Sequence, residues 1–398
     1  MPTRNIRVYY ILEMILSLSG GIIFPVYVLY FREFQITLFQ VAVLAAVFEA
    51  TIIIFEIPTG LFADRYGRRL STITGFILFS LAGIIFFEFR NFAGFLIAEG
   101  LFGLAETFIS GAMEALAVDS IDKQERKGKL ATLFANRTII KTSALLIGMI
   151  TGGLLAEWRL PALFLPLLGF SAIGAVLALL LVEPEPEPIA DKDKAPGPSL
   201  WKFIWGNPVV AALFAVGLLA NFIYEPIDQF WQVLFSEIRE IDPAFFGLMT
   251  ASGLGLVIIF TRWLKKLYHY LTAYLAACFI ILSVALYLAA LSDRYPAVVG
   301  IVVYFSIKEM VRPVISTHLN RHLESKNRAT YLSAYNLTCS IGEVAASLLA
   351  GILAAQFGVV FLFYFGSMTA TVLIGIYLVL KNGKNGHGQM DSGLTSAE

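Results

Sequence analysis

Gly60-Leu61-Phe62-Ala63-Asp64-Arg65-Tyr66-Gly67-Arg68-Arg69 is the stretch that decides the fold of this chain. It lies between two long apolar segments, at 38–58 and 70–89, which leaves room only for a tight loop. Glycines allow helix ends to approach closely or to adopt a positive φ. Arginines in a short loop beside an apolar helix indicate the cytoplasmic side of a membrane. The stretch therefore predicts two membrane-spanning helices that are joined on the cytoplasmic side.

The composition extends this prediction to the whole chain. Hydrophobic residues make up 58% of the 398 residues and charged residues only 15%, whereas about a quarter of the residues of a soluble domain are charged. Apolar segments of about 20 residues, the length that crosses a bilayer core, recur along the sequence. The net charge of zero gives no reason to expect a nucleic-acid partner. We expect an all-α membrane protein that crosses the bilayer many times.

Twelve transmembrane helices are predicted, in two groups of six. The expected spans are 6–31, 38–58, 70–89, 93–118, 129–157, 161–182, 207–235, 243–264, 268–291, 296–318, 328–356 and 358–381. Between the groups, the stretch from Glu183 to Pro198 is rich in proline and mixed charge, which favours an extended, solvated linker. The predicted domains are an N-terminal six-helix bundle at 1–182, a cytoplasmic linker at 183–206, a C-terminal bundle at 207–381 and a disordered cytoplasmic tail at 382–398.

The positive charges predict the orientation of the chain. Most of the 29 Lys and Arg residues fall in the loops on the side of the two termini. The other side holds only Arg32, Arg90, Arg159, Arg239 and Arg294. Because Lys and Arg concentrate in cytoplasmic loops, both termini and the linker are expected in the cytoplasm. The first span contains Glu13 and is not followed by a small-residue cleavage motif, so we expect a retained helix in the cell membrane rather than a signal peptide.

The 60–69 stretch resembles the loop between helices 2 and 3 of major facilitator superfamily transporters, which carries Gly-x-x-x-Asp-Arg-x-Gly-Arg-Arg. The resemblance implies two six-helix bundles with pseudo-two-fold symmetry and transport by alternating access. It also implies a cytoplasmic gating latch, for which the candidates are Gly60, Asp64, Arg65, Gly67, Arg68, Arg69 and Asp119. A weak internal repeat fits duplication, since Asn136-Arg137-Thr138 is echoed by Asn336-Leu337-Thr338.

Two positions depart from the family pattern. Many members carry an arginine in helix 4 where this chain has Glu99. The helix 5 signature of proton-driven exporters includes a proline that is missing from Gly148-Met149-Ile150-Thr151-Gly152-Gly153. These departures weaken a direct assignment to drug antiport and leave the fold prediction unchanged.

Ionisable residues inside the predicted helices are the candidates for function, because each costs at least ~2.5 kcal/mol to insert into a bilayer. The acids outnumber the cations, so some of them are expected to bind protons near neutral pH. The proton-coupling candidates are Asp228, Glu225, Glu106, Glu343, Glu309, Glu49 and Glu13. The substrate-cavity candidates are Arg137, Lys141, Lys308, Arg312, Asn221, Tyr224, Gln232 and Asn336. Permanent ion pairs between helices are the competing interpretation, with about equal weight.

These features favour a secondary active transporter, most simply a proton-coupled antiporter that exports a small organic cation or zwitterion. Proton-coupled uptake of an organic anion or zwitterion is the alternative, with the buried cations binding a carboxylate. A non-transporting membrane receptor or scaffold is a third possibility. We expect no enzymatic activity, no metal and no cofactor, since the histidines and cysteines lack ligand spacing and no phosphate-binding glycine loop is present. The expected partners are a small-molecule substrate, protons and the lipid bilayer, and the protein is expected to be a monomer.

Overall fold

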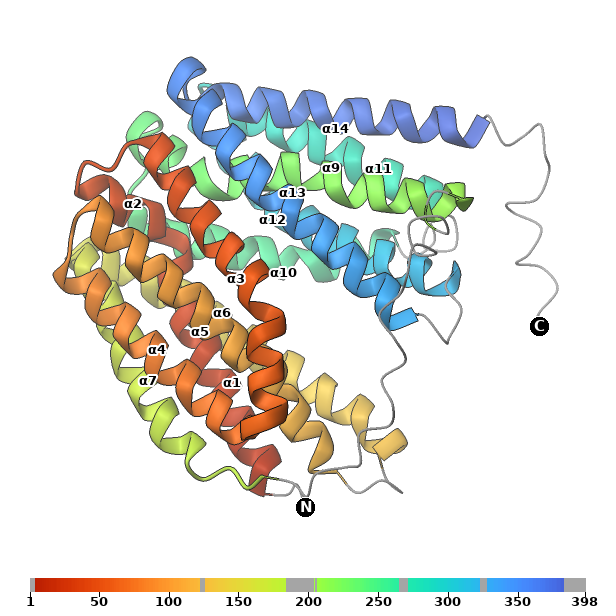
Figure 1. Cartoon of the computed structure of the whole chain (residues 1–398). Coiled ribbons are helices and arrows are strands. Elements are labelled where there is room, and N and C mark those ends of the chain that lie inside the picture. The colour runs from red at the N-terminus through yellow and green to blue at the C-terminus, as the bar shows by residue number, and fades with distance from the viewer. Residues whose placement is uncertain are drawn as a thin grey trace. The chain divides into compact units, whose positions relative to one another are not determined.

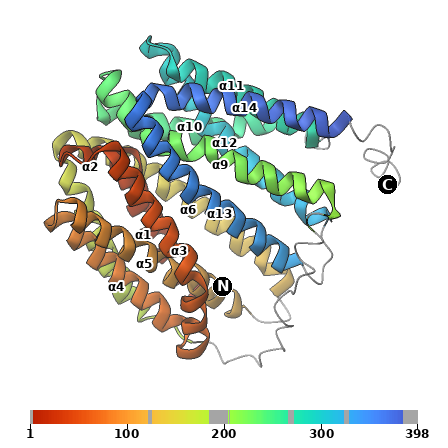
Figure 2. The same cartoon turned by 45° about the horizontal axis from the view of Figure 1, so that its top comes forward.

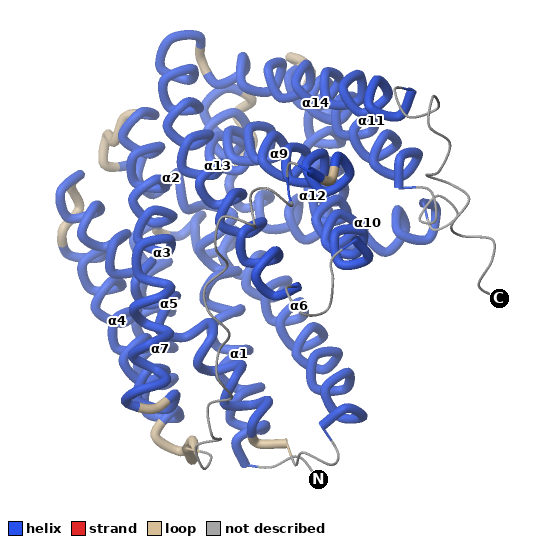
Figure 3. Tube along the Cα trace, turned by 45° about the vertical axis from the view of Figure 1, so that its right-hand side comes forward, coloured by secondary structure: helices blue, strands red, loops and turns tan. Residues whose placement is uncertain are grey.

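The computed structural model describes residues 4–121, 126–183, 204, 206–264, 271–322 and 328–382, and every element within them is helical (Figures 1 and 3). The first half contains α1 (Arg4–Ile23), α2 (Tyr27–Glu33), α3 (Leu38–Tyr66), α4 (Arg68–Glu88), α5 (Phe92–Asp119), α6 (Arg126–Trp158) and α7 (Phe164–Ala178). The second half contains α9 (Pro208–Val233), α10 (Phe246–Leu264), α11 (Leu271–Ala290), α12 (Arg294–His322), α13 (Arg328–Phe357) and α14 (Val359–Asn382). The predicted linker and tail lie almost entirely outside the described residues.

The helices have the length and composition of membrane spans. Within the described ranges, 10 helical segments are long and apolar enough to cross a bilayer, and Val359–Gly375 is a shorter apolar helix. The helix α12 has 29 residues but is not among the ten, since Lys308, Glu309 and Arg312 lower its hydropathy. The all-helical, multi-pass fold is as the composition predicts. Twelve spans and a pseudo-two-fold axis stay predictions.

The chain forms two compact units, which are described separately. The first comprises Met1–Ala195, Gln229–Ala251 and Glu343–Gln356, and the second comprises Pro196–Asp228, Ser252–Gly342 and Phe357–Glu398. In the first unit, α4 packs against α5 and α7, α3 packs against α5, and α1 packs against α6 (Figure 1). In the second unit, α11 packs against both α12 and α14, which lie along it (Figure 2).

The junction between α3 and α4 is much shorter than the sequence suggested. The expected loop at 60–69 is wrong, because α3 continues through Pro58 to Tyr66 and α4 begins at Arg68. Only Gly67 separates the two helices, with φ of 103°. A proline inside a membrane helix removes one backbone donor without ending the helix. Gly60, Asp64 and Arg65 therefore lie on the last turns of α3 rather than in a loop.

The first predicted span, at 6–31, lies within one continuous helical segment, Arg4–Glu33. Its helix type changes along the way, because α1 ends at Ile23 and a 3₁₀ turn over Phe24–Val26 precedes α2. Pro25 lies in this turn. Proline has no backbone N–H and cannot donate to the preceding turn, which explains the change of helix type at this point.

Glycines bring α1 and α6 into backbone contact. A Cβ atom at Gly152 would overlap the carbonyl oxygen of Ile22, and one at Gly148 would lie 2.5 Å from that of Leu18. Gly21 is equally restricted, since its Cβ would lie 2.5 Å from the carbonyl oxygen of Leu145. Small residues allow membrane helices to pack closely. The glycines kept at 148 and 152 therefore have a packing role that does not need the missing proline.

Candidate functional site

Arg137 lies at the centre of a charge cluster in the first unit. Its Nε is 3.3 Å from Oε2 of Glu13 and its Nη1 is 2.6 Å from Oε2 of Glu114. The three residues come from α6, α1 and α5. Glu13 is buried, with a side chain that is 6% exposed, and Arg137 is 28% exposed. The guanidinium thus connects α6 to α1 and α5. It also neutralises the carboxylate of Glu13, which has little access to solvent.

Two further charged residues belong to this cluster, which we call the Arg137 cluster. Glu106 on α5 is influenced by the charges of Lys141, Glu13 and Arg137. Lys141 is exposed, whereas Glu106 is half-buried. The Arg137 cluster therefore contains three acids (Glu13, Glu106 and Glu114) and two cations (Arg137 and Lys141).

Asp228 is the centre of a charge cluster in the second unit. Nζ of Lys308 on α12 contacts Oδ2 of Asp228 on α9. The hydroxyl of Tyr304, one turn before Lys308, donates to Oδ1 of Asp228 at 2.9 Å. The same hydroxyl lies 3.2 Å from the backbone carbonyl oxygen of Tyr224. Both carboxylate oxygens of Asp228 are thus bound from α12, one by an ammonium group and one by a phenol.

The surroundings of Lys308 complete this Asp228 cluster. The charges of Glu225 and Glu309 act on Lys308 together with that of Asp228. Glu225 is half-buried, and Glu309 and Arg312 are exposed. The Asp228 cluster therefore contains three acids (Asp228, Glu225 and Glu309) around one cation, Lys308, and the exposed Arg312 lies one turn after Lys308 on α12.

The remaining polar candidates are distributed over several sites. Asn221 is buried and donates to the carbonyl oxygen of Cys339 at 2.8 Å. The hydroxyl of Tyr224 is buried without a hydrogen-bond partner among the described residues. Asn336 is exposed on α13. Glu49 on α3 and Glu343 on α13 are half-buried and do interact with other groups.

The side chain of Gln232 binds the backbone around the 3₁₀ turn at Phe24–Val26. Its Nε2 donates to the carbonyl oxygen of Phe24 at 2.9 Å, and its Oε1 accepts from the backbone N–H of Val28 at 2.8 Å. One side-chain amide thus satisfies a backbone acceptor and a backbone donor around the 3₁₀ turn.

Arg32 at the end of α2 and Glu237 form a double ion pair, with N–O distances of 2.8 and 3.0 Å.

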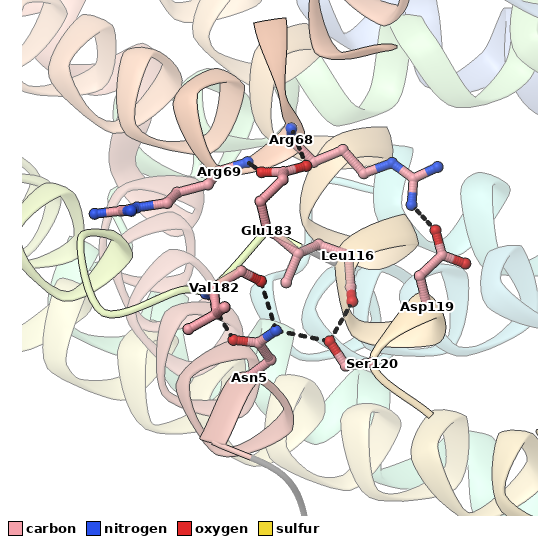
Figure 4. Close-up of polar contacts among 8 residues, drawn as sticks. All are labelled: Asn5, Arg68, Arg69, Leu116, Asp119, Ser120, Val182 and Glu183. Atoms are coloured by element: carbon pink, nitrogen blue, oxygen red, sulfur yellow. Dashed lines mark hydrogen bonds and ion pairs between the residues drawn. The ribbon is translucent and has the colours of Figure 1, made fainter. Parts of the chain in front are cut away.

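The latch candidates meet partners that lie within the first unit. Arg68 contacts the carboxylate of Asp119 at the end of α5 (Figure 4). Arg69 donates from Nη2 to the carbonyl oxygen of Leu179 at 2.8 Å. Glu183 accepts hydrogen bonds from the backbone N–H groups of Arg68 and Arg69, at 2.8 and 2.9 Å. A carboxylate at a helix N-terminus satisfies free backbone donors and complements the helix dipole. Glu183 therefore caps α4.

Asn5 connects the start of α1 to the same region. Its Nδ2 donates to the carbonyl oxygen of Val182 and to Oγ of Ser120, both at 2.8 Å, and its Oδ1 accepts from the N–H of Val182 at 2.9 Å (Figure 4). The cap of α4 and the end of α5 are thus tied to the residues that precede the linker. Asp64 and Arg65 are exposed, and the guanidinium of Arg65 lies 5.3 Å from the ring centroid of Tyr66. A gating role for these residues stays a prediction.

Sequence reasoning did not select several residues that make specific contacts, among them Tyr304 and Glu114 of the two clusters. Glu183 and Asn5 are the cap and tie described above, Glu237 pairs with Arg32, and Glu99 accepts a hydrogen bond from Tyr27. A signal was present for Glu183, which is the first acid after a long apolar segment and follows it directly. Glu99 was visible as a departure from a family pattern, but its tyrosine partner comes from a span 72 residues earlier.

Comparison with known proteins identifies the family. The family model described as Major Facilitator Superfamily matches residues 9–310. The chain belongs to this superfamily. It is 24% identical over 390 residues to the uncharacterized MFS-type transporter YxaM of Bacillus subtilis, with 94% of this chain and 95% of YxaM covered. It is 25% identical over 397 residues to multidrug resistance protein 1 of the same organism, with 96% and 97% covered.

The fold agrees with that of a solved transporter structure. The crystal structure of the nucleoside transporter NupG superimposes with a TM-score of 0.74, covering 95% of this chain and 99% of NupG, at 11% sequence identity. At this identity the likeness shows the fold alone. The protein is thus a multi-pass membrane transporter of the major facilitator superfamily.

Proposed function

We propose that the protein exports a small organic cation or zwitterion by alternating access, in exchange for protons that bind at the Asp228 cluster. The observation that carries the proposal is the binding of Asp228 by Lys308 and Tyr304 on the facing helix. The side chains of Asp228 and Lys308 are 18% and 24% exposed. A proton or an organic cation can therefore reach this carboxylate.

The charge balance favours cations over anions as cargo. Each cluster holds more acids than cations, so a bound proton or an organic cation brings its charge closer to neutrality. Uncompensated charge is costly in a bilayer, which makes the two alternatives, proton or substrate, mutually exclusive at one acid. Mutually exclusive binding of the two ligands is the requirement for antiport.

The relatives support the direction of transport. Multidrug resistance protein 1 of B. subtilis, which aligns over nearly the whole chain, carries drug resistance in its name. Resistance fits removal of organic compounds from the cytoplasm. By the distribution of positive charge, the protein lies in the cell membrane with both termini in the cytoplasm, and we propose that it acts as a monomer.

The test is proton movement in proteoliposomes that enclose a pH-sensitive dye and have an acidic lumen. Ethidium, betaine and benzoate serve as an organic cation, a zwitterion and an organic anion. Antiport predicts that ethidium makes the lumen alkaline in vesicles that contain the wild-type protein but not in vesicles that contain Asp228→Asn. If the cargo is a zwitterion, betaine is expected to have the same effect. Asp293→Asn is the matched control, because Asp293 is exposed before α12 and caps its first turn by accepting from Tyr295 N–H.

Four results would contradict the proposal. Acidification of the lumen as the compound enters indicates symport and favours uptake. A response to benzoate alone indicates an anion site at the buried cations. Proton movement that survives in Asp228→Asn places the exchange elsewhere. No movement of any compound, in vesicles that hold folded protein, favours a receptor that reuses the fold.

A further inference from the structure

Glu99 lies in an apolar part of the first unit and takes no part in the salt bridges of the Arg137 cluster. The residue is 2% exposed, and Oε1 of its carboxyl group accepts a hydrogen bond from the hydroxyl of Tyr27. Phe95, one turn earlier on α5, packs against Tyr30 and Phe31 with ring-centroid distances of 5.5 and 4.9 Å. The carboxyl group is thus buried beside aromatic rings and next to the 3₁₀ turn in the first span.

No described residue supplies a cation to this site. Against α5 pack α1, α3 and α4. Two titratable groups face Glu99: Tyr27 of α2, which acts on it through a hydrogen bond, and Glu49 of α3, which acts on it through its charge. The described part of α4 has no ionisable residue between Arg69 and Glu88, and Glu13 of α1 is bound to Arg137. The nearest charge is therefore a second acid.

An ionised carboxylate at this position would be poorly solvated. Two carboxylate oxygens offer about four acceptor positions, and the Tyr27 hydroxyl fills one. Removal of a charge from water without a partner costs several kcal/mol, which a carboxyl group avoids by keeping its proton. The situation differs from that of Glu13 and Asp228, which are both bound to cations.

We propose that Glu99 is a proton-binding site, that it carries its proton in this conformation, and that Tyr27 connects it to the 3₁₀ turn in the first span. Tyr27 is the first residue of α2, directly after the 3₁₀ turn. The backbone on either side of Tyr27 is bound by the side-chain amide of Gln232, which contacts the carbonyl oxygen of Phe24 and the N–H of Val28. The turn is therefore fixed from two sides, by Glu99 on α5 and by Gln232 on α9.

Loss of the proton changes one of these contacts. The charged carboxylate needs more donors than Tyr27 and is repelled by Glu49, so water or a rotated backbone has to enter the aromatic surroundings. This movement loosens the turn and, with it, the amide contacts of Gln232. The connection to transport rests on the proposed exchange with protons, whereas proton binding by Glu99 does not.

Infrared spectroscopy of the purified full-length protein in lipid nanodiscs tests proton binding directly. The carbonyl stretch of a protonated carboxyl group is separate from the bands of carboxylates. Wild type is expected to show a band at neutral pH that disappears at alkaline pH, is missing in Glu99→Gln and shifts in Tyr27→Phe. Glu33→Gln, which removes an exposed acid from the end of α2, is expected to keep the wild-type band.

Identical carboxyl bands in wild type and Glu99→Gln would overturn the proposal. If Glu99→Gln does not give folded protein, Tyr27→Phe decides, and an unshifted band would overturn it. Amide hydrogen exchange provides the second readout, with rates referred to unstructured peptides at each pH. Protection of the Val28 amide is expected to fall in wild type over the pH range where the band disappears, and to stay constant in Glu99→Gln. Equal protection changes in both proteins would overturn the link through Tyr27.

These readouts separate the two proposals. A titrating band that belongs to Glu99, together with proteoliposomes that show no substrate-driven proton movement, would support the Glu99 site and contradict antiport. Antiport without this band would support the proposed function and contradict the Glu99 site.

Discussion

In the first unit Arg137 lies between two carboxylates, Glu13 and Glu114, whereas in the second unit Lys308 shares one carboxylate with a tyrosine hydroxyl. A guanidinium group is planar and permanently charged, and its several donors bind two acids at the same time. An ammonium group is a compact charge on a flexible chain, which separates from its partner more easily. We interpret the Arg137 cluster as a fixed support and the Asp228 cluster as the place of exchange.

Burial supports this distinction. The side chain of Glu13 is 6% exposed and that of Asp228 is 18% exposed. Removing one partner from a buried pair leaves an uncompensated charge, and the cost increases as solvent access decreases. Substitutions in the Arg137 cluster should therefore affect folding, and substitutions in the Asp228 cluster should affect exchange.

Arg137→Met is expected to have the largest effect on stability. The substitution leaves Glu13 and Glu114 without their shared cation, and loss of one partner of a buried pair costs about 3 kcal/mol. The midpoint of thermal unfolding in detergent should fall well below that of wild type. The double variant Arg137→Met/Glu13→Gln should recover part of the loss, because no buried charge then remains at Glu13. An unchanged midpoint in the single variant would contradict the support role.

Lys308→Met should destabilise the protein less, by about 2 kcal/mol, because Asp228 keeps the Tyr304 hydroxyl and can take up a proton. The double variant Asp228→Asn/Lys308→Met should unfold close to the wild-type midpoint and show no substrate-driven proton movement. Thermal unfolding and proteoliposome assays of the same preparations measure the two effects. Proton movement retained in the double variant would show that the pair is structural, like the Arg137 cluster.

Replacing each cation by the other type tests the difference between the two clusters. Lys308→Arg gives Asp228 a guanidinium partner, which should slow exchange while changing stability by less than about 1 kcal/mol. Arg137→Lys should cost about 1 kcal/mol, since an ammonium group cannot reproduce both contacts, and should leave the stoichiometry of exchange unchanged. Faster exchange in Lys308→Arg would contradict the idea that release of the cation limits the cycle.

Glu183→Gln is expected to have the smallest effect. The amide keeps one acceptor for the N–H groups of Arg68 and Arg69 but loses the charge that favours a helix N-terminus, for a cost of about 0.5 kcal/mol. Glu183→Ala removes the cap and should cost about 1 kcal/mol. Exchange stoichiometry measured in proteoliposomes should be unchanged in both variants, because Glu183 contacts neither cluster. A lost proton response would instead give the α4 cap a role in gating.

The sequence predicted the all-helical, multi-pass architecture because the length of an apolar segment is a local property of each span. The sequence did not predict the effect of proline at two positions, and the two errors are opposite. Pro58 was taken as the end of a helix and lies inside α3, whereas Pro25 was taken as helical and lies in the 3₁₀ turn. The effect of a membrane proline depends on whether neighbouring groups satisfy the released backbone, as Gln232 does around Pro25, and that depends on the tertiary structure.

The charged residues could be selected from the sequence, but their pairing could not. A buried ion in a membrane is rare enough to be recognised anywhere in a chain. Which acid meets which cation depends on helix rotation, and Glu309 and Arg312 show how a rotation of α12 exposes two of three neighbouring charges while Lys308 reaches Asp228. Arg68 and Asp119, which the family resemblance placed in one set of latch candidates, do lie in contact.

Proton release on substrate binding tests the central claim, exchange at Asp228, most directly. Ethidium is added to purified protein in weakly buffered detergent that contains a pH indicator, in parallel with Asp228→Asn and the Asp293→Asn control. Protons are expected to appear in solution as ethidium binds to wild type and to Asp293→Asn, whereas Asp228→Asn releases none. Equal release from Asp228→Asn, or binding to wild type without any release, would contradict exchange at this carboxylate.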